Sequence, residues 1–266
     1  MVSFDLWETL LLETDGADSR RILARCQNLS ETLNKFGVQF SVEQLLSALK
    51  VMVPWLVKIW ETNCDVTHLD QIRFIINTAS KGSVTLREEW IDELSAAYVS
   101  PLFEVPPYLN PNAQKVLQWL KDKDRIIGLI CNTGRTPGFS LRRFLDREGI
   151  AEYFDLMLFS DEIGIRKPNP EIFLMAAETM NVKPWEVVHV GDNLKSDVYG
   201  AKNAGLKAIY LSTETGRDEK AESDPNSLVS ISRKLENLEE KEIIPDRIVT
   251  SLDMVVEAIE TLEKKS

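Results

Sequence analysis

The chain has 266 residues, of which 44% are apolar and 27% charged, and its formal net charge is −11. This composition is ordinary for a folded globular protein and argues against wholesale disorder. The excess of acids argues against a nucleic-acid binder with a broad basic face. A small anionic substrate remains possible, because a metal ion and one lysine can reverse the charge locally.

Neither the cysteines nor the N-terminus indicates export. Cys26, Cys64 and Cys131 form no CxxC spacing, and so sparse a set fits a reducing compartment. Asp5 and Glu8 interrupt the first apolar residues, and no basic segment precedes them, unlike a signal peptide. No apolar run is long enough to span a bilayer. We therefore expect a cytoplasmic protein, monomeric or homodimeric, that binds neither nucleic acid nor membrane.

A short apolar strand opens the chain, and a helical insert follows it. The strand VSFDL carries Asp5 at its carboxyl end. Capping-box patterns, Ser41 with Gln44 and Thr85 with Glu88, each predict the start of a helix. Helical spacing and these caps predict four helices, over 18–36, 41–61, 67–80 and from 85 to the region of 98. An extended proline-rich segment over 101–111 marks the exit from this four-helix insert.

After the insert, buried strands alternate with amphipathic helices. The strands are predicted over 125–133, 155–160, 186–192 and 207–212, with helices over 113–121, 140–148, 170–180 and 196–204. A polar loop over 216–227, a charged helix over 232–242, a strand over 247–252 and a closing helix complete the chain. This alternation predicts an α/β fold with a Rossmann-like parallel sheet. We expect residues 1–13 and 106–266 to form that core and residues 14–105 to form an inserted four-helix cap.

Polar residues follow four of the predicted strands. They are Asp5, the turn Asn132-Thr133-Gly134, Lys167, and the pair Asp192 and Asp197. The carboxyl ends of parallel strands meet at one edge of a sheet, which is where such folds bind ligands. Each residue alone suits an ordinary turn or helix start. Together, a carboxylate nucleophile, a hydroxyl, a cation and two acids are what phosphoryl transfer through an aspartyl-phosphate requires.

The motifs around these residues resemble those of the haloacid dehalogenase-like hydrolases with a helical cap. FDLWETL (4–10) resembles the first motif of that family and LICNTG (129–134) the second. GIRKPNPEIF (164–173) resembles the third, and VVHVGDNLKSDVYGAKNAGL (187–206) the fourth. The resemblance covers nearly the whole chain and is weakest across the insert and 213–246. It is specific for the superfamily and not for the substrate.

The resemblance implies a role for each residue of the phosphoryl site. Asp5 is the implied nucleophile, and Thr133 and Lys167 are implied to bind the phosphoryl group. Asn132 and Gly134 belong to the same predicted substrate-binding turn.

A magnesium site is also implied. Asp5 and Asp192, with help from Asp197, are the implied side-chain ligands, and the backbone carbonyl of Trp7 completes the set. Hard oxygen donors of this kind suit Mg²⁺.

Trp7 stands where phosphatases of the family carry a second Asp, which protonates the leaving group. Indole has only an N–H donor and cannot replace it. Neighbouring Glu8 is expected to point away from the site. The leading interpretation is a slow or selective Mg²⁺-dependent hydrolase of a small phosphorylated metabolite. The alternatives are a 2-haloacid dehalogenase, which the intact Gly191-Asp192 disfavours, and a phosphate-binding protein without catalysis.

Three arginines lie on the first helix of the predicted cap. We expect Arg20, Arg21 and Arg25 to lie on a solvated face. The alternative is that one of them selects an anionic substrate.

Overall fold

The computed structural model describes residues 1–212 and 243–264, and a six-stranded parallel sheet forms the centre of its larger lobe. The strand order is β5-β4-β1-β6-β7-β8, so β1 lies between β4 and β6. The chain adds strands on one side of β1 first and on the other side afterwards. This arrangement places the change of topological direction at the end of β1. The strands are β1 (Val2–Phe4), β4 (Ile127–Cys131), β5 (Leu156–Phe159), β6 (Val188–Gly191), β7 (Lys207–Leu211) and β8 (Arg247–Val249).

Helices cover both faces of the sheet. On one face lie α6 (Ala113–Asp122), α7 (Gly138–Arg147) and α13 (Val255–Glu263), and on the other α9 (Pro170–Thr179) and α10 (Gly200–Asn203). Successive residues of β4 divide between the two cores: Leu129 and Cys131 pack into one and Ile130 into the other. Burial on both faces explains why these strands read as continuous apolar runs. The predicted α/β class and parallel sheet are confirmed.

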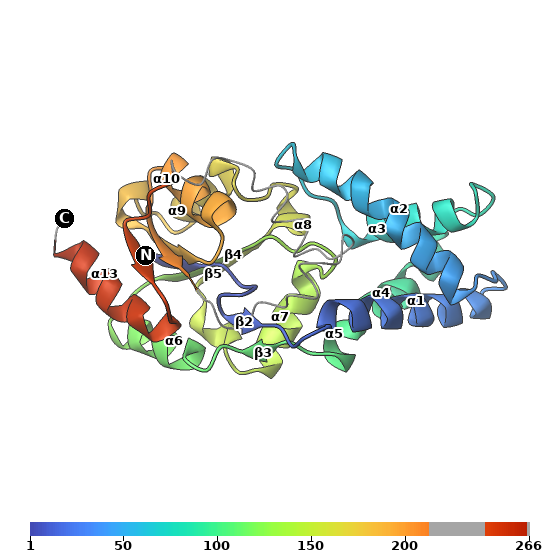
Figure 1. The fold of residues 1–266 in the computed structure, drawn as a ribbon, viewed down its shortest axis with the longest axis horizontal. Coiled ribbons are helices and arrows are strands. Elements are labelled where there is room, and N and C mark those ends of the chain that lie inside the picture. The colour runs from blue at the N-terminus through green and yellow to red at the C-terminus, as the bar shows by residue number, and fades with distance from the viewer. Residues whose placement is uncertain (213–242, 265–266) are drawn as a thin grey trace.

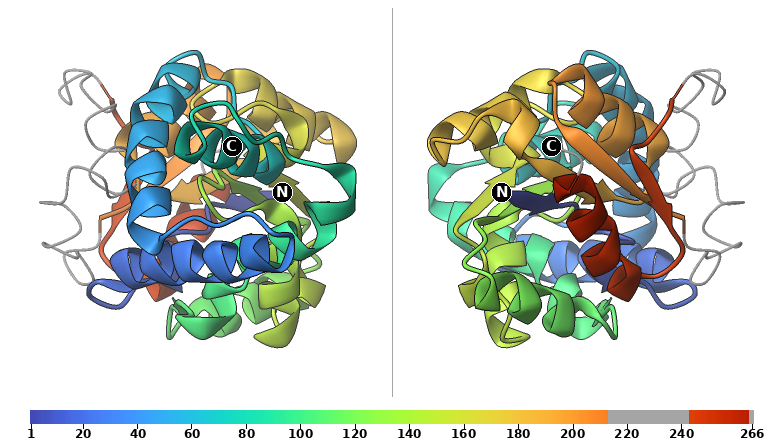
Figure 2. Two further views of the ribbon diagram at one scale, coloured as in Figure 1. Left: turned by 90° about the vertical axis from the view of Figure 1, so that its right-hand side faces the viewer. Right: turned by 90° about the vertical axis from the view of Figure 1, so that its left-hand side faces the viewer.

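The insert forms a second lobe beside the sheet (Figures 1 and 2). It contains α1 (Ala17–Lys35), α2 (Val42–Trp60), α3 (His68–Ala79) and α4 (Ile91–Val99), which share a hydrophobic core of their own. A small antiparallel ribbon of β2 (Leu11–Leu12) and β3 (Tyr108–Leu109) joins the segments that enter and leave it. We propose that residues 14–105 form the cap. The ribbon supports these boundaries because it pairs the segment that enters the insert with the segment that leaves it.

Two details of the insert were predicted wrongly. Thr85 does not cap the fourth helix, which begins after Arg87 with the short 3₁₀ turn η1 (Glu88–Trp90). The segment over 101–111 is only partly extended, because Pro101 occupies the first turn of α5 (Pro101–Glu104). The box at Ser41 is present as predicted, and Thr67 forms another with Asp70.

The remaining elements are short. They are η2 (Ala151–Tyr153), α8 (Ser160–Ile163), η3 (Pro184–Glu186) and η6 (Leu252–Met254), with the π-helical turn η4 (Leu194–Tyr199) preceding α10 where a single helix over 196–204 was expected. The polar loop and charged helix expected over 216–227 and 232–242 lie outside the described residues. No helix in the described part of the chain is long and apolar enough to cross a membrane.

Candidate active site

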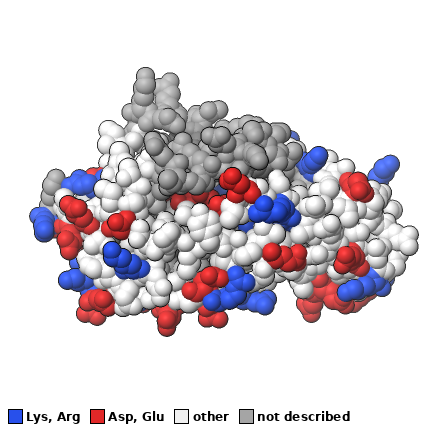
Figure 3. All heavy atoms as spheres, turned by 60° about the horizontal axis from the view of Figure 1, so that its bottom comes forward, with Lys and Arg blue, Asp and Glu red and all other residues white. Residues whose placement is uncertain are grey.

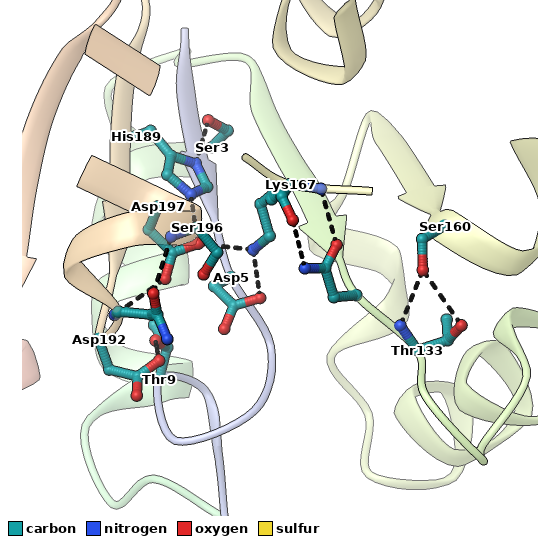
Figure 4. Close-up of polar contacts among 12 residues, drawn as sticks. Ser3, Asp5, Thr9, Thr133, Ser160, Lys167, His189, Asp192, Ser196 and Asp197 are labelled. Carbon is teal, nitrogen blue, oxygen red and sulfur yellow. Dashed lines mark hydrogen bonds and ion pairs between the residues drawn. The ribbon is translucent and has the colours of Figure 1, made fainter. Parts of the chain in front are cut away.

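The buried ammonium of Lys167 connects two carboxylates from different parts of the chain (Figure 4). Its Nζ lies 2.5 Å from Oδ1 of Asp5 and 2.7 Å from Oδ1 of Asp197. Asp5 follows β1 directly, and its backbone N–H donates to the carbonyl of Val190 at 2.9 Å. All three residues are less than 10% exposed. The strand ends therefore meet as the sequence predicted.

Asn132 holds the backbone of Lys167 in place. The N–H of Lys167 donates to Oδ1 of Asn132 at 2.9 Å, and Nδ2 of Asn132 donates to the carbonyl of Lys167 at 3.0 Å. This reciprocal pair fixes the segment after α8 against the end of β4. The side chain of Asn132 thus positions the lysine, in addition to its predicted place in the substrate-binding turn.

Three carboxylates gather on one side of the ammonium. One oxygen each from Asp5, Asp192 and Asp197 lies within 4.8 Å of the others. Burial raises the pKa of Asp192 well above its usual range, and repulsion from Asp5 and Asp197 adds to the shift. Burial likewise raises the pKa of Asp5, despite the opposing attraction of Lys167. Ionising all three acids beside one lysine leaves two uncompensated negative charges, so this oxygen-only donor set fits a divalent cation.

A histidine of strand β6, His189, contacts Asp197. Nε2 of His189 lies 3.2 Å from Oδ1 of Asp197, and Nδ1 lies 2.9 Å from Oγ of Ser3. Burial lowers the pKa of His189, although Asp197 acts in the opposite direction, so a neutral ring is favoured. A neutral ring with its proton on Nε2 donates to Asp197 and accepts from Ser3. His189 thus orients the carboxylate that Lys167 also contacts.

Thr133 stands apart from the charged cluster (Figure 4). Its backbone N–H donates to Oγ of Ser160 at 3.0 Å, and its own hydroxyl lies 3.3 Å from the same oxygen. The carbonyl of Gly134 accepts from Nε2 of Gln71 on α3, at 2.8 Å. The structure therefore ties Thr133 and Gly134 to Ser160 and to the cap, and their phosphoryl-binding role stays a prediction.

Two further residues lie near the site, and sequence reasoning missed one of them, Thr9. Its Oγ1 lies 3.5 Å from Oδ1 of Asp192. The only available signal was its position four residues after Asp5, which suits an ordinary turn. Cys131 is the last residue of β4 and is fully buried, as a small core residue would be; burial together with the charge of Asp5 raises its pKa well above the usual range.

Trp7 and Glu8 border the carboxylates. The ring of Trp7 is half-buried against the core, with the guanidinium of Arg21 5.7 Å from its centroid. Glu8 has a left-handed backbone, with φ of 57°, and its negative charge contributes to the raised pKa of Asp192. Glu8 lies in the turn after β1, so the strand alternation on which its expected direction rested does not apply to it.

The chain belongs to the haloacid dehalogenase-like hydrolases, since the model of that family matches residues 1–205. A second model, of HAD-hydrolase-like proteins, matches residues 164–254. Both matches include the third and fourth motifs, and the first model spans all four.

Several curated relatives of the chain are phosphatases. Glyceraldehyde 3-phosphate phosphatase of Pyrococcus abyssi is 31% identical over 213 residues, covering 79% of this chain and 80% of the relative. The enzyme of that name from Pyrococcus furiosus is 37% identical over 46% of this chain and 50% of its own. Phosphoserine phosphatase of Thermus thermophilus is 34% identical over 54% of this chain and 55% of its own. The chain thus spans about half the length of several relatives.

The fold is shared by solved structures of both a dehalogenase and a phosphatase. A 2-haloacid dehalogenase from Pseudomonas syringae has a TM-score of 0.65 at 22% identity, covering 98% of this chain and 97% of that one. A HAD phosphatase from Thermococcus onnurineus has a TM-score of 0.56 at 22% identity, covering 97% and 96%. At this identity the likeness shows the fold and does not choose a reaction.

Gly191 makes room for Asp197, which gives a first prediction. A Cβ at position 191 would lie 2.3 Å from Cγ of Asp197. Gly191→Ala should therefore displace this carboxylate and lower the free energy of unfolding by about 1–3 kcal/mol, as overpacking does. Urea unfolding measures the effect. An unchanged midpoint and slope would contradict the close packing.

Asp161 gives a prediction on pH. It is buried, accepts from the N–H of Gly138 at 3.0 Å, and has a pKa raised to about 6, chiefly by burial. A carboxyl with a raised folded-state pKa stabilises the fold at low pH, and this contribution is lost as pH rises through 6. Asp161→Asn should therefore remove about 2 kcal/mol of the fall in unfolding free energy between pH 4.5 and 7.5.

Urea unfolding at both pH values measures this difference. Asp122→Asn, an exposed change on α6, is the matched control and should leave the pH dependence intact. Parallel pH profiles for wild type and Asp161→Asn would count against ionisation of Asp161 as the cause.

Proposed function

We propose that the chain is a Mg²⁺-dependent phosphatase that hydrolyses a small phosphate monoester through an aspartyl-phosphate on Asp5. The observation that carries the proposal is the buried Lys167 ammonium held between Asp5 and Asp197, beside the carboxylate of Asp192. The family and the phosphatase names of several relatives support it. We also propose that the protein acts in the cytoplasm, which its sparse, unpaired cysteines support.

Asp5 would attack phosphorus with one carboxylate oxygen. The ester P–O bond breaks as the new bond forms, and the leaving oxygen departs with the electron pair. Lys167, 2.5 Å from the nucleophile, opposes the charge repulsion between the carboxylate and the incoming phosphoryl group. Water then attacks phosphorus, and the bond between phosphorus and the Asp5 oxygen breaks, which restores the Asp5 carboxylate. The oxygen of water leaves in inorganic phosphate, and one of its protons ends on the alcohol formed from the leaving oxygen.

A divalent cation fits the same cluster. Asp5, Asp192 and the backbone carbonyl of Trp7 would hold it, and Asp197 would help to orient the group. When bound, Mg²⁺ supplies positive charge between the carboxylates and the phosphoryl oxygens. The excess negative charge of the three acids, of which Asp5 and Asp197 are buried and Asp192 is partly buried, supports this assignment.

Trp7 determines how efficient the reaction is. Without a carboxylic acid at this position, an alkoxide leaving group finds no donor there, which typically costs about 10²–10⁴-fold in rate. For esters whose leaving group needs no proton, the loss in rate is smaller. We therefore propose a slow or selective enzyme, with the substrate chosen partly by leaving-group acidity.

Phosphate release with and without Mg²⁺ tests the main proposal. We expect wild type to release phosphate from some members of a panel of phosphomonoesters and acyl phosphates. Chelation of the metal and Asp5→Asn should each reduce release at least 100-fold, because both remove the means of attack. The exposed change Asp92→Asn should leave the rate unaltered.

The same assay separates the alternatives. Halide release from 2-haloacids that persists under chelation would replace the phosphatase with a dehalogenase. Binding of phosphate without turnover of any ester would indicate a protein that binds but does not catalyse.

Trp7→Asp is the second test of the mechanism. Supplying a carboxyl at this position should raise kcat for alkyl phosphates at least tenfold and change kcat little for acyl phosphates, which need no proton donor. Trp7→Phe is the matched control for loss of the indole and should give no such gain. An equal effect of Trp7→Asp on both ester classes would mean that proton donation is not the limitation.

A further inference from the structure

Three buried arginines lie between the cap and the core, and we name them the arginine cluster. Arg21 and Arg25 come from α1, and Arg135 from the turn after β4; they are 5%, 2% and 2% exposed. The solvated face expected for the first two is therefore wrong. Arg25 bonds both lobes: its Nε donates to the carbonyl of Tyr98 on α4 of the cap at 2.9 Å, and its Nη2 donates to the carbonyl of Arg135 in the core at 3.4 Å.

The cluster carries more positive charge than its partners neutralise. Arg21 pairs with Glu13, and Nη2 of Arg135 lies 2.9 Å from Asp18. Among the described residues Arg25 has no ion pair, and its hydrogen bonds go to backbone carbonyls, including that of Arg135 at 3.4 Å. Burial lowers the pKa of Arg25, and the positive charge of Arg135 lowers it further.

Arg135 also has hydrogen-bonding capacity left over. Its Nε and Nη1 are both buried and have no partner among the described residues. A buried donor without a partner costs about 1–3 kcal/mol, and more when it is charged. Excess positive charge and two unpartnered nitrogens of one guanidinium, Nε and Nη1, favour an anionic ligand with several oxygens.

The arginine cluster borders the candidate active site. Arg135 lies on the turn over 133–136, directly after the Asn132 that holds Lys167. On the other side, Arg21 lies over the ring of Trp7, two residues from Asp5. The arginine cluster therefore contacts the Trp7 segment that follows Asp5, and its Arg135 belongs to the turn that follows Asn132.

We propose that the arginine cluster, with Arg135 as the main donor, binds a second anionic group of the substrate, either a carboxylate or a second phosphate. This inference rests on the proposed phosphatase function and narrows its substrate to phosphate esters with two anionic ends. Asp18 competes with that second group for Arg135.

Matched pairs of esters test the proposal. Phosphoglycolate is compared with 2-hydroxyethyl phosphate, and 1,3-propanediol bisphosphate with 3-hydroxypropyl phosphate, so that each pair differs chiefly in the second anion. Wild type should prefer the doubly anionic member of at least one pair by about 10- to 100-fold in kcat/KM, the range expected of charged hydrogen bonds. The preferred pair identifies the anion as carboxylate or phosphate.

Variants assign the preference to Arg135. Arg135→Gln should abolish this preference by raising KM for the ester that carries the second anion. It should change kcat/KM for the ester without that second anion less than about threefold. Asp18→Asn, which frees Nη2 of Arg135, should increase the preference. Arg73→Gln, an exposed arginine on α3, is the control and should change nothing.

Each outcome decides the proposal. No preference in wild type, or equal losses on both members of a pair in Arg135→Gln, would mean that the cluster only joins cap to core. If Arg135→Gln does not fold, Asp18→Asn decides, and an unchanged or smaller preference overturns the inference. If wild type hydrolyses no ester, the phosphatase proposal fails, and calorimetric binding of the same pairs to wild type and variants still measures the preference.

Discussion

The rest of the site depends on one buried ammonium, that of Lys167, between Asp5 and Asp197. Burying separate charges is costly, and removing one partner of such a group leaves an uncompensated charge that is worse still. The sheet reduces this cost by bringing three strand ends, and with them the opposite charges, to one edge. Asn132 fixes the backbone of the lysine, and His189, itself held by Ser3, contacts Asp197.

The lysine alone does not balance the acids around it. Asp192 completes a group of three carboxylates, and its raised pKa expresses the cost of adding another negative charge to a buried site. A divalent cation would relieve that cost, and its positive charge would also offset that of an incoming, negatively charged phosphoryl group. The acidic surface charge is no obstacle, since acidic and basic side chains are interspersed on the face in Figure 3 and the local field governs binding.

The sequence predicted those parts of the molecule that follow from repeating patterns. Continuous apolar strands alternating with helices predicted the parallel sheet, and strand ends predicted that Asp5, Lys167, Asp192 and Asp197 meet. Repeating patterns say least where the backbone is irregular. The left-handed backbone of Glu8 breaks strand alternation, and the contacts of Thr133 with Ser160 follow from the turn after β4 and not from the strand itself. Burial of Arg25 depends on how α1 packs against another domain, which helical spacing alone does not reveal.

The cap touches the site through the same segments that carry its chemistry. Asp65, from the cap, accepts from Ser160 at 2.5 Å, and Ser160 in turn bonds Thr133. The N–H of Arg166 donates to the carbonyl of Asn63 at 3.0 Å, one residue before Lys167. Because both the lysine segment and the turn after β4 contact the cap, movement of the cap would shift the groups that hold the phosphoryl end. Docking of the cap and assembly of the site are therefore one process, and a ligand that reached both lobes would stabilise both together.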